Sequence, residues 1–354
     1  MEQTIVTEIA HIDQLLQGKK FLLVKSRSYD SLAVRSHFDG LDHVEFSGFT
    51  PNPLYEQVCA GVTLFNSEHC EMIVAVGGGS AIDVAKCIKL FCRMDPSVNY
   101  LEQEKFDSGI PLIAVPTTAG TGSESTRHAV IYYEGVKQSV SHSSIVPDYA
   151  VLEPSVLKNL PDYQKKCTML DALCQAVESW WSVHSTDESK EYAKQAIAGI
   201  TANWEAYIFG NSETAAAKIM LASNYAGRAI NITATTAAHA MSYKITSLYR
   251  FPHGHAVAIC IPEVWEYVLA HTDDCIDSRG ADYLRDTLAQ ISEMITLDQF
   301  KAMLTAMGMQ SPESGDKETE LETLVQSVNP VRLKNNPVAL NADVLRQMYR
   351  RIVR

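Results

Sequence analysis

The chain has 354 residues, of which 46% are hydrophobic and 20% are charged, and this is enough for two domains with sizeable cores. Its formal net charge of −12 argues against a nucleic-acid partner, because proteins that bind nucleic acids present a basic surface to the phosphates. We see no signal-peptide pattern, no apolar run of transmembrane length and no Cys-x-x-Cys pair among the eight cysteines, so we expect a cytoplasmic protein with reduced thiols and no membrane partner.

The first half of the chain alternates short apolar segments with helical ones. The apolar segments that we predict to be strands cover residues 21–24, 44–46, 72–76 and 110–115. Helical patterns lie between them at residues 31–38, 53–66 and 81–91. Strands separated by helices of this length predict a parallel, doubly wound α/β sheet.

The third predicted strand leads into the glycine-rich turn Gly77-Gly78-Gly79-Ser80. Three glycines leave backbone N–H groups uncovered beside a helix N-terminus, which Ser80 could cap. Such a turn is typical of a site for the pyrophosphate of a cofactor. The run matches neither the Gly-x-Gly-x-x-Gly nor the Walker pattern, so a tight turn without a ligand is the alternative.

A second run of glycines and small hydroxyl residues follows the fourth predicted strand, from Pro116 to Glu124. It stands at the carboxyl end of a strand, where open α/β sheets bind their ligands. Its hydroxyl groups suit contact with ribose and phosphate, although a surface loop is the alternative. The hydroxyl residues expected to contact a cofactor are Thr117, Thr118, Thr121 and Ser123.

Helical periodicity dominates the second half, at residues 171–181, 189–203, 213–228 and 297–306. Pro154 and Pro161 mark the change of character. We therefore expect an α/β domain over residues 1–158 and an all-helical domain over residues 159–354.

The helical half contains a candidate metal site. Asp171 and Gln175 are four residues apart, so they project from the same helix face. His239 and His253 could add two imidazoles, and such a mixture of ligands suits zinc or ferrous iron. The spacing alone favours the alternative of structural, hydrogen-bonded histidines.

Taken together and in this order, the motifs resemble the iron-containing (group III) alcohol dehydrogenases over nearly the whole chain. The matching segments are Thr50-Pro51-Asn52-Pro53, the Gly77 turn with Asp83 and Lys86, Pro116 to Glu124, Pro147-Asp148, Leu160-Pro161, Asp171-Ala172-Leu173, His239 and Pro252-His253-Gly254. The resemblance implies an α/β dinucleotide-binding domain with a parallel sheet, followed by an all-α metal-binding domain (the dehydroquinate synthase-like fold), with the active site in the cleft between them.

The resemblance also implies roles for particular residues. The metal, Fe²⁺ or Zn²⁺, would be held by Asp171, Gln175, His239 and His253, with Gln175 in place of a family histidine. The cofactor would contact Ser26, Asp83, Lys137 and the two glycine-rich runs. An aldehyde polarised by the metal would accept hydride from the nicotinamide, and His255 or Tyr243 would help deliver the proton. For His255, a purely structural role is an equal alternative. Tyr243 stands where many members of the family carry another histidine.

Lys25 and Arg27 follow the first strand, where members that prefer NAD tend to carry an acidic residue, so we expect NADPH rather than NADH. The alternative is that both are solvated surface cations and carry no information on the cofactor. The pattern around Gln175 and His255 is most similar to the branch that includes phosphonoacetaldehyde reductases. We therefore expect reduction of a small aldehyde to a primary alcohol, with the anionic phosphonoacetaldehyde and its product 2-hydroxyethylphosphonate as the leading pair, in phosphonate metabolism. The cations proposed to bind an anionic substrate are Arg127, Lys244 and Arg250.

Other functions remain open. One is a general short-chain alcohol or lactaldehyde dehydrogenase, and another is a non-redox lyase like the dehydroquinate synthases. A metal-free member with a binding role is a third, suggested by Gln175. The family resemblance further implies a homodimer.

Overall fold

The computed structural model describes residues 3–354, which form two compact units. The first unit extends to Leu160 and also includes Asn211–Met220, and the second comprises Pro161–Gly210 and Leu221–Arg354. The long helix α6 (Glu213–Thr233) therefore belongs to the first unit at its beginning and to the second unit afterwards. We expected the domain boundary after residue 158, whereas the first unit extends to Leu160.

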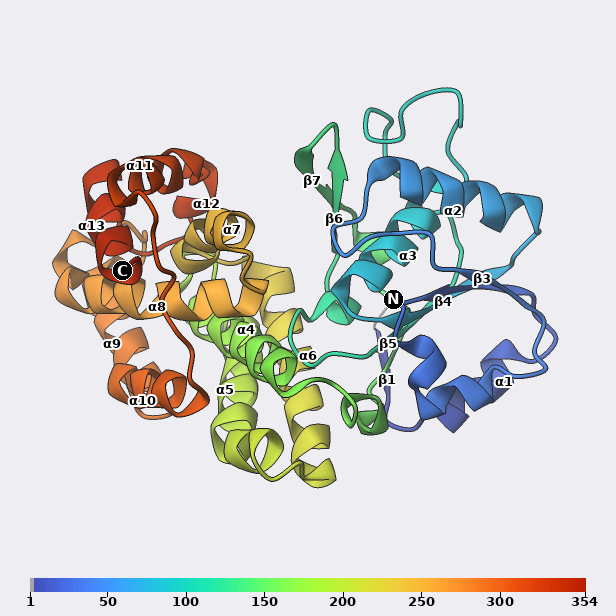
Figure 1. Cartoon of the computed structure of the whole chain (residues 1–354), viewed down its shortest axis with the longest axis horizontal. Coiled ribbons are helices and arrows are strands. Elements are labelled where there is room, and N and C mark those ends of the chain that lie inside the picture. Colours follow the sequence, from blue (N-terminus) through green and yellow to red (C-terminus); the bar gives the residue numbers. More distant parts are fainter. Residues whose placement is uncertain (1–2) are drawn as a thin grey trace. The chain divides into compact units, whose positions relative to one another are not determined.

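The first unit contains a parallel sheet of six strands in the order β1-β8-β5-β4-β2-β3 (Figure 1). Its central strands β4 and β5 are buried along their whole length, as expected for a sheet covered on both faces. The strands are β1 (Thr4–Val6), β2 (Phe21–Lys25), β3 (His43–Phe46), β4 (Met72–Gly77), β5 (Leu112–Pro116) and β8 (Tyr149–Val151).

The strand order places a topological switch point between β2 and β4. From β2 the chain moves outward to β3, returns past β2 to β4, and then continues in the opposite direction to β5 and β8. In open α/β sheets, ligands bind at the carboxyl ends of the strands that flank such a point. Here those ends are Lys25 and Gly77, which the parallel pairing of β2 with β4 brings to the same edge.

Helices α1 (Asp13–Leu16), α2 (Tyr55–Ser67) and α3 (Gly79–Phe91) accompany the sheet. Almost all of α3 is buried, and Ile82, Ala85 and Ile88 belong to the hydrophobic core of this unit. The helix predicted at residues 31–38 is instead two short 3-10 segments, at Tyr29–Ser31 and Ala33–His37.

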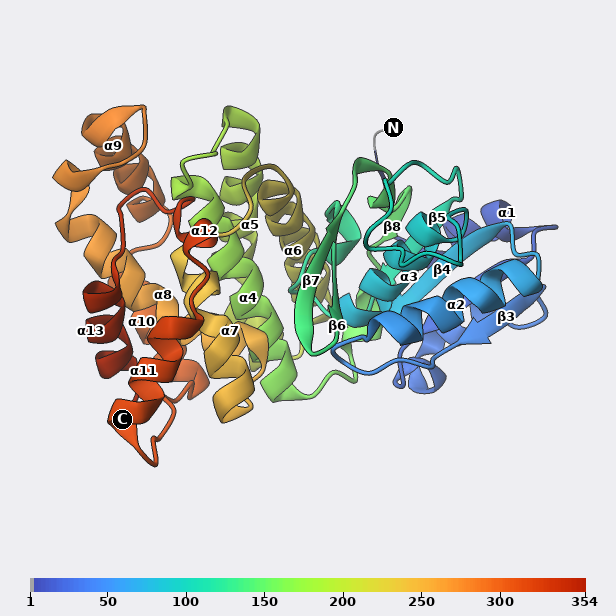
Figure 2. The same cartoon turned by 90° about the horizontal axis from the view of Figure 1, so that it is seen from above.

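The sequence analysis missed an antiparallel hairpin of β6 (His128–Tyr133) and β7 (Val136–Ser141), which Figure 2 shows as a pair of long strands. Its two-residue turn consists of Glu134 and Gly135, both with positive φ, as a type I′ turn requires.

The second unit is entirely helical apart from short connections. Helix α4 is buried almost throughout from Cys167 to Trp181, and it packs against α5 and α8 (Figure 1). The Trp181 and Trp265 rings meet edge to face at 5.7 Å between α4 and α8. The helices are α4 (Asp162–Trp181), α5 (Asp187–Ile208), α7 (Ala237–Tyr249), α8 (His253–Ala270), α9 (Gly280–Ser292), α10 (Leu297–Met307), α11 (Lys317–Ser327), α12 (Pro330–Leu333) and α13 (Ala342–Ile352), with the later part of α6.

This architecture confirms the predicted fold class, a parallel α/β unit together with a helical unit. All eight cysteines are free thiols. Among residues 3–354, no helix combines the length and the apolar character that a membrane span would need.

Candidate functional site

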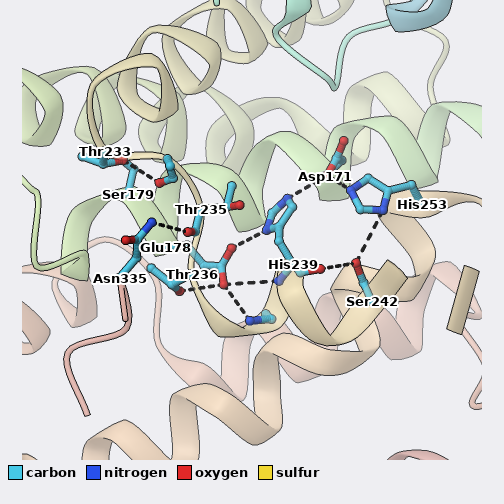
Figure 3. A network of polar contacts seen from close by, with 12 residues as sticks. Asp171, Glu178, Ser179, Thr233, Thr235, Thr236, His239, Ser242, His253 and Asn335 are labelled. Atoms are coloured by element: carbon cyan, nitrogen blue, oxygen red, sulfur yellow. Dashed lines mark hydrogen bonds and ion pairs between the residues drawn. The ribbon is translucent and has the colours of Figure 1, made fainter. Parts of the chain in front are cut away.

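Three potential metal ligands meet in the second unit, one from each of three helices (Figure 3). Asp171 comes from α4, His239 from α7 and His253 from the first position of α8. The Asp171 Oδ1 atom lies 3.3 Å from His239 Nε2 and 4.0 Å from His253 Nε2. All three ligand atoms lie within 4.8 Å of one another, so one ion could contact all of them.

The imidazoles of His239 and His253 are each oriented by a hydrogen bond at Nδ1. Ser242 donates its hydroxyl proton to the His239 carbonyl at 2.8 Å, which leaves its oxygen to accept from His253 Nδ1 at 3.5 Å. His239 Nδ1 donates to the Glu178 carboxylate. Because each Nδ1 is engaged in this way, the two Nε2 atoms face Asp171 and are the atoms through which a metal would be ligated, in place of any proton on Nε2.

Glu178 is a supporting residue to which the sequence analysis gave no role. It is fully buried, and besides His239 it accepts hydrogen bonds from the Thr236 hydroxyl at 2.7 Å and the Ala238 backbone N–H at 2.8 Å. Its position seven residues after Asp171 places both on one face of α4, and this spacing was a readable signal.

Burial and charge act against each other in this pair. Burial lowers the pKa of His239, but the carboxylates of Glu178 and Asp171 outweigh it and raise that pKa to about 9. Burial would raise the pKa of Glu178, whereas the neighbouring His239 charge holds it below its usual range. The pocket therefore stabilises positive charge at His239, which is also what a divalent cation would supply.

The donor set fits Fe²⁺ or Zn²⁺, because one carboxylate and two imidazoles are common ligands of both metals. Asp171 and His239 are buried, whereas the His253 side chain is 36% exposed. A site closed on one side and open on the other suits catalysis better than a purely structural metal. Gln175 is buried one turn after Asp171, on the face of α4 that also carries Glu178, and its ligation of the metal stays a prediction.

The two predicted proton donors occupy different environments. The Tyr243 ring stacks parallel to the His253 ring, with centroids 5.5 Å apart. His255 instead accepts from the Tyr163 hydroxyl at Nδ1 (2.7 Å) and donates from Nε2 to the Gln310 carbonyl (2.9 Å). Burial lowers the pKa of His255, which favours this neutral form.

His255 also lines a cavity of about 430 Å³ together with Tyr163, Tyr249, Phe251 and Gln310. The three candidate metal ligands are not part of that lining. Through Tyr163 and Gln310, the hydrogen bonds of His255 link α8 to α4 and to the segment after α10. Such links are what a purely structural role of His255 would produce.

In the first unit, the two glycine-rich turns lie in contact at the edge of the sheet. A side chain at Gly79 would meet Thr121 at 3.1 Å, and one at Gly78 would meet Thr118 at 3.5 Å. Gly77 approaches Ser26, since an added Cβ would lie 3.0 Å from the Cβ of Ser26. The structure thus brings most of the predicted cofactor residues of the two turns to the β2/β4 switch point.

The prediction that Ser80 caps helix α3 is wrong. The helix begins at Gly79, after Gly78 as the N-cap residue, and no side chain caps it, so Ser80 is not the cap. The Ser80 hydroxyl donates instead to the Pro51 carbonyl. A helix N-terminus whose first N–H groups are not bonded to a side-chain cap retains donors for an anion.

Asp83 joins α3 to the second glycine-rich run and to the hairpin. Its oxygens accept from the Ser123 hydroxyl at 2.6 Å and from the Val130 N–H at 2.9 Å. Burial raises the pKa of Asp83, while the charges of Lys86 and Lys137 act in the opposite direction. Contact of Asp83 or Lys137 with the nicotinamide stays a prediction.

The end of β2 is less basic in the structure than the sequence suggested. Lys25 is paired with Asp30 at 3.0 Å and with Glu45 at 2.8 Å, so two carboxylates do lie beside the end of β2. Arg27 is exposed and is the remaining cation of that segment.

The three cations proposed for an anionic substrate are all at least partly exposed. Arg127 is exposed after the second glycine-rich run, and Lys244 is partly exposed on α7 next to Tyr243. Arg250 is exposed at the C-cap of α7 with a left-handed backbone, φ 58°.

Comparison with known proteins covers both units. The family described as iron-containing alcohol dehydrogenase matches residues 4–154, and the C-terminal part of the Fe-containing alcohol dehydrogenase family matches residues 166–353. The fold is similar to that of sulfoacetaldehyde reductase from Bifidobacterium kashiwanohense in complex with NAD⁺, with a TM-score of 0.88 and 26% identity over 99% of this chain and 96% of that one.

Three relatives illustrate the range of the sequence matches. The chain is 34% identical over 270 residues to 1,3-propanediol dehydrogenase of Citrobacter freundii, covering 72% of this chain and 70% of that protein. It is 28% identical over 310 residues to phosphonoacetaldehyde reductase of Streptomyces viridochromogenes, covering 82% and 78%. A shorter match of 34% identity over 220 residues, to the probable alcohol dehydrogenase EutG of Escherichia coli, spans 61% of this chain and 56% of that relative. With family matches over both units, this chain belongs to the iron-containing alcohol dehydrogenase family of oxidoreductases.

Proposed function

We propose that the protein reduces a small aldehyde to a primary alcohol with a nicotinamide cofactor, at a divalent metal held by Asp171, His239 and His253. The observation that carries this proposal is the convergence of three ligand atoms within 4.8 Å, with one imidazole exposed. Gln175 is the proposed fourth ligand.

When bound, the ion supplies Lewis-acid polarisation of a carbonyl, and the nicotinamide supplies hydride. The protein's part is to hold these groups in place. Glu178 fixes the tautomer and the orientation of His239, and Ser242 does the same for His253. Because these hydrogen bonds already hold His239 and His253 in position, the two imidazoles need not reorient during the reaction. Such preorganisation lowers the activation barrier.

Tyr243 is the proposed residue for proton delivery at its phenol oxygen. Its ring lies against His253, whereas both nitrogens of His255 are already engaged in hydrogen bonds. Tyr243→Phe retains the ring and removes the hydroxyl, so it should lower kcat about tenfold to a hundredfold with bound metal unchanged. An unaltered kcat in this variant would remove the proposed role.

The proposed substrate carries an anionic group, with phosphonoacetaldehyde and its product 2-hydroxyethylphosphonate as the leading pair. Support comes from two relatives whose names specify aldehydes with an acidic group, the phosphonoacetaldehyde and sulfoacetaldehyde reductases. A neutral short-chain alcohol or lactaldehyde dehydrogenase is the second candidate, favoured by the similarity to 1,3-propanediol dehydrogenase.

The test is an assay of protein loaded with Fe²⁺ or Zn²⁺, with NADPH or NADH, against phosphonoacetaldehyde, sulfoacetaldehyde, lactaldehyde and propanal. We expect stoichiometric oxidation of the cofactor and a kcat/KM at least tenfold higher for the anionic aldehydes. Equal values for propanal would favour the neutral dehydrogenase. Absence of net cofactor oxidation with every aldehyde would contradict the reductase and leave the lyase or a binding role.

For the cofactor we propose NADPH, and Arg27 is the cation that would meet its 2′-phosphate, since Lys25 is already paired. Arg27→Gln should lower kcat/KM for NADPH about tenfold and leave that for NADH unchanged. Equal effects on both cofactors would place the 2′-phosphate elsewhere.

We also propose a cytoplasmic location and a homodimer. The free state of all eight thiols supports the first, and the second follows from the family resemblance. Light scattering on the purified protein would test the dimer, and cell fractionation would test the location.

A further inference from the structure

A guanidinium group that the sequence analysis did not consider lies over Tyr243, whose ring packs on the candidate metal ligand His253. The Arg332 Cζ atom lies 5.2 Å from the centroid of the Tyr243 ring, and that ring is parallel to the His253 ring at 5.5 Å. Arg332, Tyr243 and His253 therefore form a stack that runs from a positive charge to a candidate metal ligand.

The helix that carries Arg332 is fixed in place. Helix α12 packs on α7, which carries Tyr243 (Figure 1). Asn329 caps α12 by accepting from the Val331 N–H at 2.9 Å. Just after the helix, the Asn335 side chain donates to the Thr235 carbonyl at 3.1 Å, beside the Thr236 that supports Glu178 (Figure 3). Arg332 is thus held against the same part of α7 that positions the metal ligands.

The charge of Arg332 has no carboxylate within ion-pair distance in the described part of the chain. Five other arginines of the second unit do pair with carboxylates, namely Arg279, Arg285, Arg346, Arg350 and Arg351. The side chain of Arg332 is only partly exposed, so its charge is not simply a solvated surface charge. Stacking on a ring occupies one face of a guanidinium and leaves its in-plane N–H groups able to hold two oxygens of an oxyanion.

We propose that Arg332 binds the anionic group of the substrate while the carbonyl occupies the metal site. This inference rests on the proposed function and deepens it, because it assigns the recognition of the anion to one residue. Arg332 Cζ lies 5.2 Å and the His253 ring centroid 5.5 Å from the centroid of the same Tyr243 ring, so the substrate must be a short aldehyde with a phosphonate, sulfonate or carboxylate group near its carbonyl carbon. Arg332 takes the role that the sequence analysis gave to Arg127, Lys244 and Arg250.

The test compares Arg332→Gln with Arg332→Lys and with a control, Lys334→Gln. Lys334 is exposed two residues further along, so its removal changes the net charge equally without touching the stack. Three quantities are measured for each variant: kcat/KM for phosphonoacetaldehyde and for propanal, the bound metal, and the calorimetric affinity for 2-hydroxyethylphosphonate.

We expect Arg332→Gln to lower kcat/KM for phosphonoacetaldehyde tenfold to a hundredfold and to weaken 2-hydroxyethylphosphonate binding similarly. Its kcat/KM for propanal should fall by a clearly smaller factor, and its metal content should stay within about twofold of the unaltered protein. Arg332→Lys should retain part of the preference, because charge remains but the planar fork is lost. Lys334→Gln should behave like the unaltered protein.

The outcomes separate this inference from the function on which it rests. If the unaltered protein prefers phosphonoacetaldehyde and Arg332→Gln keeps that preference, Arg332 is not the anion site although the function stands. Equal losses for both aldehydes would show that the arginine only supports Tyr243, and they overturn the inference. If no aldehyde is reduced, the proposed function fails, yet loss of 2-hydroxyethylphosphonate binding in Arg332→Gln alone would still support the anion site. An unaltered protein that reduces propanal without preferring the anion overturns the inference as well.

Discussion

At the scale of single residues, the surroundings of Gly254 explain why a glycine follows the candidate ligand His253. A Cβ on Gly254 would lie 1.9 Å from the Cys167 carbonyl oxygen and 2.9 Å from the Cβ of Asp171. The backbones of α8 and α4 therefore touch at this point, and the contact sets His253 beside Asp171. The sequence shows the Pro-His-Gly motif, but only the packing of the two helices shows what the glycine contributes.

Gly254→Ala should force α8 away from α4 and separate His253 from Asp171. We expect metal affinity to fall at least tenfold and the free energy of unfolding to fall by about 1–3 kcal/mol, as for other overpacked contacts. Competition with a chromophoric chelator and urea unfolding measure the two effects. Gly315→Ala is the control, since a Cβ there meets only the Glu320 carboxylate at 3.9 Å. Unchanged metal affinity in Gly254→Ala would show that α4 and α8 accommodate the methyl group without separating His253 from Asp171, and it would contradict the prediction.

The glycines of the first turn differ in what surrounds them, and this gives a second prediction. A Cβ on Gly78 would make only ordinary contact with Thr118 at 3.5 Å, whereas one on Gly77 would lie 2.5 Å from the Cβ of Ala81. Gly78→Ala should therefore raise the cofactor Kd at least tenfold with stability retained, because the methyl group occupies space near the proposed pyrophosphate. Gly77→Ala should mainly lower stability. Fluorescence titration with NADPH and urea unfolding compare them, and normal NADPH affinity in Gly78→Ala would place the phosphates elsewhere.

At the scale of secondary-structure elements, α3 holds the second glycine-rich run through two charged side chains. Lys86 is completely buried and donates to the Ser123 and Thr126 hydroxyls, each at 3.1 Å, and to the His128 carbonyl at 2.9 Å. Asp83 binds the same run from the previous turn of the helix. The sequence analysis included both residues among its motifs, but it could not show that they connect elements, because those contacts depend on the tertiary path of the loop.

The buried Lys86 gives stability a distinct pH dependence. Burial lowers its pKa to about 8, although the charges of Asp83 and Glu124 oppose this. Between pH 8 and the ordinary lysine value the unfolded chain binds more protons at this site, so its contribution to the free energy of unfolding rises with pH. We expect an increase on the order of 1–3 kcal/mol across that window, which Lys86→Met should abolish.

Urea unfolding at several pH values between 7.5 and 10.5 measures this effect. The exposed Lys19, changed to Met, is the matched control and should leave the pH dependence unaltered. A Lys86→Met protein with the same slope as the unaltered protein would show that Lys86 stays charged in the folded state.

The elements that the sequence analysis missed have identifiable causes. Strand β1 has only three residues and pairs with β8, about 145 positions away, so no local pattern marks it. The β6–β7 hairpin could have been found, since Glu134-Gly135 is a turn dipeptide that follows the apolar-rich segment His128–Tyr133. The 3-10 segments replaced a predicted helix because residues 29–38 are too short and too irregular to form a regular amphipathic face.

At the scale of the whole chain, the sequence predicted the order of the two kinds of structure and the ligands that converge on the candidate metal site. The convergence of Asp171, His239 and His253 could be expected only from the family resemblance, because Asp171 and His239 are 68 positions apart and spacing alone favoured structural histidines. Their ligation of a metal stays a prediction. The support by Glu178 could have been inferred from its position on α4. The stack on Tyr243 could not, because Arg332 is on a separate short helix and reaches Tyr243 only through packing.

Metal binding should stabilise the folded chain, because the ligands come from three helices that an ion would link. At a free metal concentration one hundred times its Kd, binding adds about 2.7 kcal/mol to the free energy of unfolding. We expect Zn²⁺ to raise the unfolding temperature, chelation to reverse the rise, and His253→Ala to abolish it while the stabilisation by NADPH remains.

His253 suits this test because its partly exposed side chain can be removed with little damage to the core. Replacement of the exposed His184 by Ala is the control and should leave the metal response intact. A full Zn²⁺ response in His253→Ala would mean that the ion binds elsewhere, and it would remove the basis for placing the chemistry at this site.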